Sequence, residues 1–276
     1  MEADETRPSA WQPFTFRGVA AFAQASVGRL LATQLVVALI SGGVLAACFQ
    51  FGWNPSIRAA VADLPPEGEI DHGELNWHAP APVRLGTGTL LSFVIDPEDR
   101  GELGQTADVE CIFLRKEMRI RSSLGFVSIP YPGNETFAFN RPELLPWWGA
   151  WRPITLALIV LVSAILLVGS WWVLAVVYLP VIRLVAFYAD RAITSTDAWK
   201  LAGAAVLPAA FLMDVTIAAY ASHRLSLLQL LTGFVAHIVT GWIFVLIAPT
   251  RLPRMARGTT VIVKSKNPFA PPPPPS

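Results

Sequence analysis

Apolar residues dominate four long stretches of the chain. The longest uncharged run, Ile154–Ile182, contains 29 residues. An α-helix rises about 1.5 Å per residue, so about 20 apolar residues cross the ~30 Å hydrocarbon core of a bilayer. We therefore expect four spans, at 30–50, 153–188, 199–220 and 225–250. The second span continues beyond Pro180 as an extension along the inner membrane surface.

Between the first two spans, residues 51–152 contain short alternating segments separated by turn residues, a pattern typical of strands. A short helix at Asn54–Asp63 precedes them, with Asn54 as its cap and Pro55 in its first turn. Strands are expected at Gly68–Asp71, Glu74–His78, Thr89–Asp96, Asp108–Leu114, Met118–Arg121, Leu124–Ile129 and Thr136–Phe139. The predicted fold is an α-helical integral membrane protein with four transmembrane helices. A small β-rich, α+β extracytoplasmic domain is inserted between helices 1 and 2.

Residues 1–29 are expected to form a cytoplasmic N-terminus with an interfacial helix. The amphipathic segment Phe14–Val27 either lies on the inner membrane surface or extends the first span inward. Leu45–Cys48 (LAAC) is similar to a lipoprotein cleavage site, but the preceding leader is long and carries acidic residues. An uncleaved helix is the expectation, and acylation of Cys48 is the alternative.

Charge supports a membrane class and gives the orientation. Only 15% of residues are charged, against about 25% in typical soluble domains. Residues 51–152 hold 9 Lys and Arg against 14 Asp and Glu, net −5; the remainder holds 12 against 6, net +6. These basic residues gather at one set of span ends and in a basic, Pro-rich tail at 251–276. The positive-inside rule then predicts a multi-pass membrane protein, N-in and C-in, and the basic residues do not indicate a nucleic-acid partner.

Three segments carry a resemblance to known proteins: Ile70–Leu75 (IDHGEL), Leu91–Asp96 (LSFVID) and Asp197–Phe211 (DAWKLAGAAVLPAAF). They resemble an uncharacterised family of bacterial four-span inner-membrane proteins with helices related to the Yip1-like superfamily. The resemblance implies an N-terminal span, an extracytoplasmic domain and three further spans. It implies no catalytic residues.

Polar residues within an expected span are functional candidates by default. Asp214 on the third span and His237 on the fourth lie on stripes of small residues that favour close helix packing. A turn centred on His223 would place Asp214 within reach of Gln229 and Thr232. We expect these three residues to clamp the last hairpin. A proton or ligand role for Asp214 and His237 is one alternative, and Asp214 reaching the outer interface is another.

The extracytoplasmic domain holds four potential metal ligands within eight residues: Asp71, His72, Glu74 and His78. They form a metal site only if a hairpin at His72-Gly73 makes them converge, and otherwise they are an exposed polar turn. The acidic run 96–102 could bind Ca²⁺ but matches no EF-hand spacing. No motif predicts a cofactor.

These features favour a non-enzymatic membrane protein whose extracytoplasmic domain binds or senses a ligand or an envelope partner. It would contact membrane lipid and a protein partner or a second copy of itself. One alternative is a transporter component or accessory subunit that uses Asp214 and His237. The other is a membrane enzyme, for which no catalytic residue is indicated.

Overall fold

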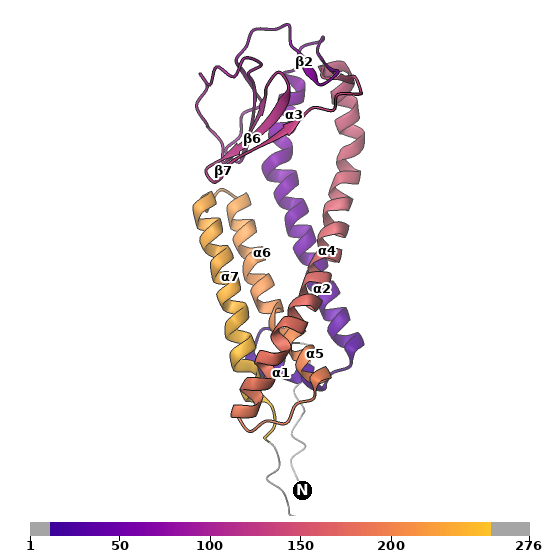
Figure 1. Cartoon of the computed structure of the whole chain (residues 1–276). Coiled ribbons are helices and arrows are strands. Elements are labelled where there is room, and N and C mark those ends of the chain that lie inside the picture. Colours follow the sequence, from indigo (N-terminus) through magenta and orange to yellow (C-terminus); the bar gives the residue numbers. More distant parts are fainter. Residues whose placement is uncertain (1–11, 255–276) are drawn as a thin grey trace, which may run out of the picture.

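The computed structural model describes residues 12–254, and its long helices carry a sheet domain at one end (Figure 1). The α-helices are α1 (Phe16–Ala21), α2 (Val27–Cys48), α3 (Asn54–Ala62), α4 (Arg141–Tyr188), α5 (Ser195–Ala205), α6 (Leu207–Ala221) and α7 (Leu227–Ile247). Three short helices join them: η1 (Phe22–Gln24), η2 (Phe49–Trp53) and η3 (Ala248–Arg251). Four helical runs are long and apolar enough to cross a membrane, namely Val27–Ala62, Arg141–Tyr188, Ser195–Ala221 and Leu227–Arg251. The prediction of four long apolar helices together with β-structure is confirmed.

Two sheets lie between α3 and α4 in the chain. Their strands are β1 (Glu69–Asp71), β2 (Glu74–Asn76), β3 (Val83–Leu85), β4 (Leu91–Ile95), β5 (Val109–Phe113), β6 (Glu117–Ser122), β7 (Gly125–Pro130) and β8 (Phe137–Ala138). The orders are β2-β1-β8 and β3-β4-β5-β6-β7, with only β4 and β5 parallel. The seven predicted strands are confirmed. Strand β3, which follows directly on Pro82, was not predicted.

The core of the sheet domain lies between the five-stranded sheet and α3. Ile95 and Leu85 pack there with Ala60 and Leu64. Gly86 allows this close approach, because a side chain on it would meet the Ser56 carbonyl oxygen at 2.3 Å. Helix α3 confirms the predicted short helix, although its expected cap is wrong. Asn54 instead accepts a hydrogen bond from the Trp148 indole at 3.0 Å, since the helix continues directly from η2.

Helix α4 begins twelve residues before the expected boundary at 153, so residues 141–152 belong to the helix rather than to the sheet domain. Asn140 explains the early start, because its side chain accepts a hydrogen bond from the Glu143 N–H at 3.1 Å. The helix then continues through Pro153 and Pro180 to Tyr188. The single long helix predicted through Pro180 is therefore present.

The third apolar run is two helices rather than one. Helix α5 ends at Ala205 and α6 begins at Leu207, because Pro208 has no N–H to continue the ladder and fits the first turn of a new helix. Lys200 was expected near the inner end of the third span. In the structure it lies in α5, and its side chain is buried. Its ammonium donates to the Ala25 carbonyl and to Asp197, each at 2.9 Å.

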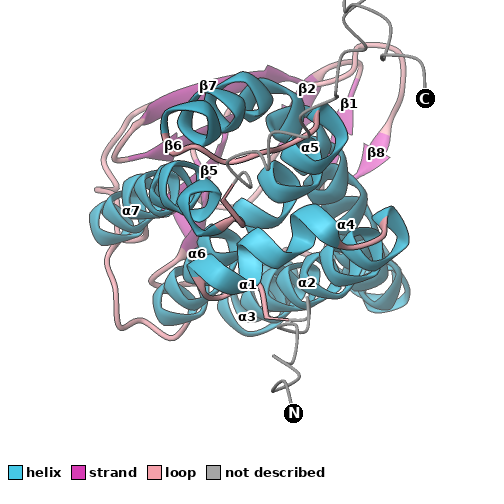
Figure 2. Cartoon of the chain, turned by 90° about the horizontal axis from the view of Figure 1, so that it is seen from below, coloured by secondary structure: helices cyan, strands magenta, loops and turns pink. Residues whose placement is uncertain are grey.

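The N-terminal segment forms α1 and η1, separated from α2 by an extended Ala25 and a Ser26 cap. The alternative that it extends the first span is therefore wrong. Val19 and Phe22 are fully buried against α5 and η3. Both ends of the described chain thus lie at the end of the helices opposite the sheets (Figures 1 and 2). The leader 1–11 and tail 255–276 lie outside the described residues.

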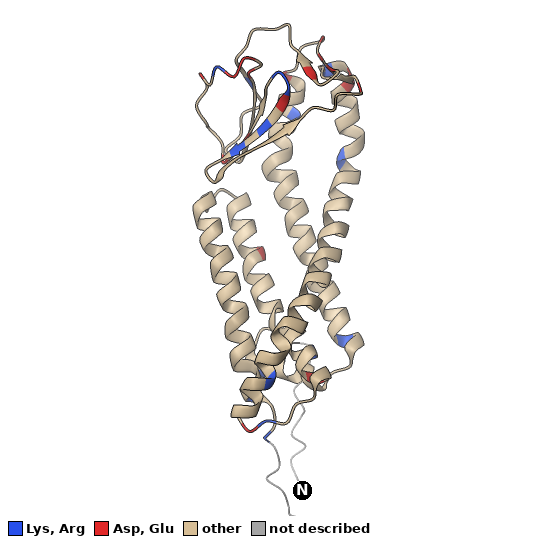
Figure 3. Cartoon of the chain, viewed as in Figure 1, with Lys and Arg blue, Asp and Glu red and all other residues tan. Residues whose placement is uncertain are grey.

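Apolar side chains cover the outer surfaces of the long helices. Ile165 and Val173 on α4 are 62% and 65% exposed, and Val235 on α7 is 59% exposed. Charged residues are concentrated at the two ends of the molecule and are sparse along the helices (Figure 3). Exposed apolar surface of this extent is unusual for a protein that is surrounded by water.

Candidate functional site

The four candidate metal ligands do not converge. Asp71 lies beside His72, at 2.8 Å between Oδ1 and Nδ1, and also accepts from Thr136. These two hydrogen bonds, that from Thr136 first, lower the pKa of the Asp71 carboxyl. Glu74 instead pairs with Lys116 at 3.0 Å, and His78 lies beyond the end of β2. Within residues 12–254 no group of three His, Cys, Asp or Glu residues is placed to hold a metal ion. The predicted hairpin is present, but it forms the exposed polar turn.

Acidic side chains in the run 96–102 already have partners within the protein. Asp96 accepts the backbone N–H groups of Arg100 and Gly101 at 3.0 and 2.9 Å, so it shapes a turn. Glu98 pairs with Arg100, and Asp99 pairs with Arg119 at 3.0 Å. These contacts use the oxygens that a Ca²⁺ ion would need.

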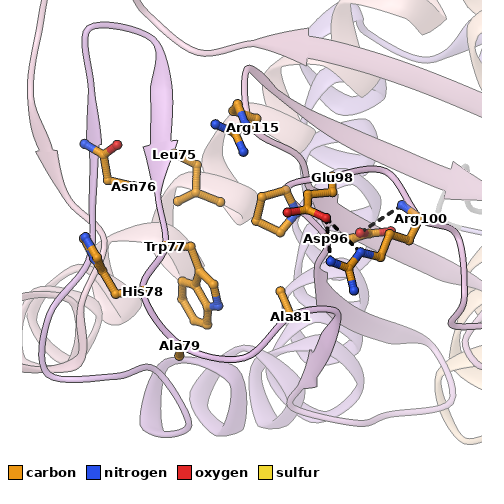
Figure 4. Close-up of a pocket in the computed structure, with 11 residues that line it drawn as sticks. Leu75, Asn76, Trp77, His78, Ala79, Ala81, Asp96, Glu98, Arg100 and Arg115 are labelled. Carbon is orange, nitrogen blue, oxygen red and sulfur yellow. Dashed lines mark hydrogen bonds and ion pairs between the residues drawn. The ribbon is translucent and has the colours of Figure 1, made fainter.

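A cavity of about 370 Å³ opens between β2 and this turn, and it is the candidate binding site (Figure 4). Trp77 forms one wall and Ala81 lies across from it, and Pro97 also lines the cavity. The Trp77 ring is held from behind by Phe139, with ring centroids 6.4 Å apart. Its nitrogen edge turns toward Ala81 (Figure 4). The indole N–H is shielded from solvent and makes no hydrogen bond within residues 12–254.

Arg115 lines the cavity with an exposed guanidinium that pairs with no acidic group among the described residues. Its guanidinium makes no hydrogen bond or ion pair within residues 12–254, whereas Arg100 on the opposite wall is held by Glu98. Asp96 and Glu98, the acidic groups lining the cavity, are both already engaged. Within residues 12–254 the cavity therefore offers an unpaired guanidinium and a flat apolar wall. That combination suits a small organic anion with a planar apolar part.

A second cavity, of about 250 Å³, lies on the other side of the Asp96–Gly101 turn and has no comparable free charge. Arg119 is held by Asp99 and Glu117, and Arg121 is held by the fully buried Glu110. The arginines of the second cavity are therefore already paired with acidic groups, and the first cavity is the better binding candidate.

The residues predicted to clamp the last hairpin do not meet. Asp214 accepts a hydrogen bond from Ser41 of α2 at 2.8 Å. Gln229 is engaged in a capping box with Ser226 at the start of α7, and the Thr232 hydroxyl donates to the Leu228 carbonyl of its own helix. Asp214 thus joins α6 to α2, and the predicted partners are wrong.

His237 lies on the α7 face that packs against α6, as the stripe of small residues indicated. Side chains added at Gly233 and Gly241 would meet Thr216 at 2.3 Å and Ala209 at 3.7 Å. The Nδ1 atom of His237 is buried without a partner within residues 12–254, and no hydrogen bond joins it to Asp214. The two candidate residues therefore do not form a pair.

Sequence reasoning missed Gln34, which connects three helices. It is fully buried on α2, accepts from the Trp172 indole and donates to the Gly203 carbonyl, each at 3.0 Å. The sequence held one signal for this role, because Gln34 is a lone amide within an apolar run. Gly203, which has no side chain, lets α5 approach Gln34 closely.

No protein-family model, no curated protein and no solved structure matches the chain. The resemblance to a four-span bacterial membrane family therefore stays a prediction, and function has to be argued from the site.

Proposed function

We propose that this chain is a multi-pass protein of the bacterial inner membrane, with both termini cytoplasmic and the sheet domain outside. The apolar outer surfaces of α4 and α7 support the membrane placement. The basic residues at the span ends opposite the sheets support the orientation, and both described chain ends lie on that same side.

Within this arrangement the sheet domain binds a small organic anion in the cavity beside Trp77. The observation that carries this proposal is Arg115, a cavity-lining guanidinium without a partner in the described chain. An Arg–carboxylate pair would give the ligand its orientation, and the Trp77 ring would pack against its planar part. The four helices would anchor the domain, and the protein would act as a binding or sensing module.

Binding of aromatic monocarboxylates, with benzoate and indole-3-acetate as first probes, tests this proposal. The detergent-purified protein should show saturable binding by calorimetry. Arg115→Gln should weaken binding about tenfold or more, because a charge-assisted hydrogen bond is lost. Lys116→Gln is the matched control, since its neighbouring ammonium pairs with Glu74 instead of lining the cavity. Equal weakening by both substitutions would remove the argument for Arg115, and no binding by any small carboxylate would remove the proposed ligand class.

The transporter alternative draws on Asp214 and His237. Asp214 is 7% exposed and bonded to Ser41, which favours a role in holding helices together. The binding proposal is therefore the one with a direct structural argument.

A further inference from the structure

Strand β7 is an edge strand with four large apolar side chains exposed in and beside it. Leu124, in the β6–β7 turn, and Phe126 are each 68% exposed, Val127 is 63% exposed and Ile129 is 44% exposed. Only β6 pairs with β7 among the described strands. Exposed apolar groups in such a row mark a contact surface whose occupant has to be identified.

The two faces of the β6–β7 hairpin differ sharply in charge. Val127 and Ile129 stand opposite Ile120 and Met118, so this apolar face of the hairpin carries no charged side chain. The other face carries Glu117, Arg119 and Arg121, and Phe126 lies there under the Arg119 guanidinium at 5.6 Å. The hairpin is thus amphipathic across its thickness.

The apolar face of the hairpin points toward the helices. Ile120 lies opposite Cys111, and Met118 lies opposite Phe113 on the same face of β5. Phe113 in turn lines a small apolar cavity that α3 and Leu144 of α4 close from below. Helix α3 covers this inner part of the face, whereas Val127 and Ile129 extend beyond it.

The hairpin lies at the height where the long helices end. The turn that joins α6 to α7 touches the sheet domain, with His223 Nδ1 2.9 Å from Thr89 Oγ1. Tyr220 on α6 donates to Asp108 at 3.0 Å, and the next residue, Val109, stands opposite Ser122 at the end of β6. The tip of β7 therefore lies just above the α6–α7 turn (Figure 1).

We propose that the apolar face of the β6–β7 hairpin rests on the outer leaflet of the membrane. Leu124, Val127 and Ile129 contact lipid acyl chains, while Arg119 and Arg121 stay on the water side. This inference rests on the membrane placement proposed above and is independent of the Arg115 cavity. Lipid fits better than strand pairing with a second copy, because Pro130 lacks an N–H and Gly125 has φ +129°. These two residues leave only a short edge for pairing.

Spin labels in bilayer nanodiscs of phosphatidylethanolamine and phosphatidylglycerol test this contact. Single cysteines replace Leu124 or Val127 in the full chain after Cys48→Ala and Cys111→Ala. Ser128→Cys, on the charged face beside Val127, is the matched water-side control, and Ile165→Cys on α4 is the lipid control. We expect the labels at 124 and 127 to collide readily with oxygen. Their collisions with a water-soluble nickel chelate should be several-fold fewer than those of the label at 128.

Two results would overturn the proposal. Labels at 124 and 127 that meet the nickel chelate as readily as the label at 128 would show that this face is in water. Labels shielded from both reagents, with spin–spin broadening that grows with the number of copies per disc, would show a second copy on this face. If the label at 165 also reports water, the membrane placement itself is wrong, so the two failures are distinguishable.

Discussion

The hydrogen bond between Ser41 and Asp214 is expected to hold the α6–α7 hairpin against α2. Both side chains are buried, at 4% and 7% exposure, and the Ser41 hydroxyl donates to the carboxyl oxygen at 2.8 Å. Hydrogen bonds between membrane helices contribute roughly 0.6–2 kcal/mol. Serine can also turn back to a carbonyl of its own helix, which limits the cost of losing its partner.

The expected free-energy changes follow from these contacts. Ser41→Ala should lower the free energy of unfolding by about 1 kcal/mol, and Asp214→Leu by about 1–2 kcal/mol. Asp214→Asn keeps an acceptor for Ser41 and should cost less than about 0.5 kcal/mol. In a double-mutant cycle the Ser41→Ala and Asp214→Leu effects should be coupled by about 1 kcal/mol, because the second substitution has no bond left to break.

Reversible unfolding in mixed micelles with sodium dodecyl sulfate, followed by circular dichroism, measures these values. Thr232→Ala is the control, since that exposed hydroxyl bonds only within its own helix. If the Ser41→Ala and Asp214→Leu changes in unfolding free energy are strictly additive, the proposed bond is refuted. An Asp214→Leu variant as stable as the control would refute it too. A folded Asp214→Asn variant that loses its cellular function would instead favour the proton role.

Three further predictions concern other contacts. Gln34→Leu removes the acceptor of the Trp172 indole and should cost about 1–2 kcal/mol in the same unfolding assay. Gly233→Leu should separate α6 from α7 and cost about 1–3 kcal/mol, because an added side chain meets Thr216 at 2.3 Å; a melting temperature equal to that of the parent would contradict this packing. Burial raises the pKa of Cys111 from 9.0 to about 11, so its thiolate fraction near pH 8 should be about 100-fold lower than that of an ordinary thiol. Its alkylation rate should keep rising about tenfold per pH unit up to about pH 10, and a rate that levels off between pH 9 and 10 would contradict the shift.

The long helices and most strands could be predicted because their signals are local. An uncharged run of 29 residues or an alternating strand reports its own structure without reference to the rest of the chain. The start of α4 was missed because the Asn140 cap lies within a segment rich in turn residues, well before the uncharged run begins at Ile154.

The partners of the polar residues could not be predicted in the same way. Which residue faces Asp214 depends on the rotation of α6 and on how closely α2 approaches, and these are set by packing between distant segments. The Gly42 position, where an added side chain would meet the Val160 carbonyl oxygen at 2.8 Å, illustrates this dependence. The cavity has the same origin, because Trp77 follows a strand of one sheet and Arg115 lies in the β5–β6 turn of the other.

Labelling of single cysteines in intact bacterial cells tests the central claim most directly. In the variant without Cys48 and Cys111, Glu102→Cys places a thiol in the sheet domain and Ala192→Cys places one in the turn between α4 and α5. Both positions are exposed. A membrane-impermeant maleimide should label the cysteine at 102 in intact cells and the one at 192 only after the membrane is permeabilised. Labelling at 192 in intact cells, or equal labelling of both, would contradict a membrane between the sheet domain and the α4–α5 turn.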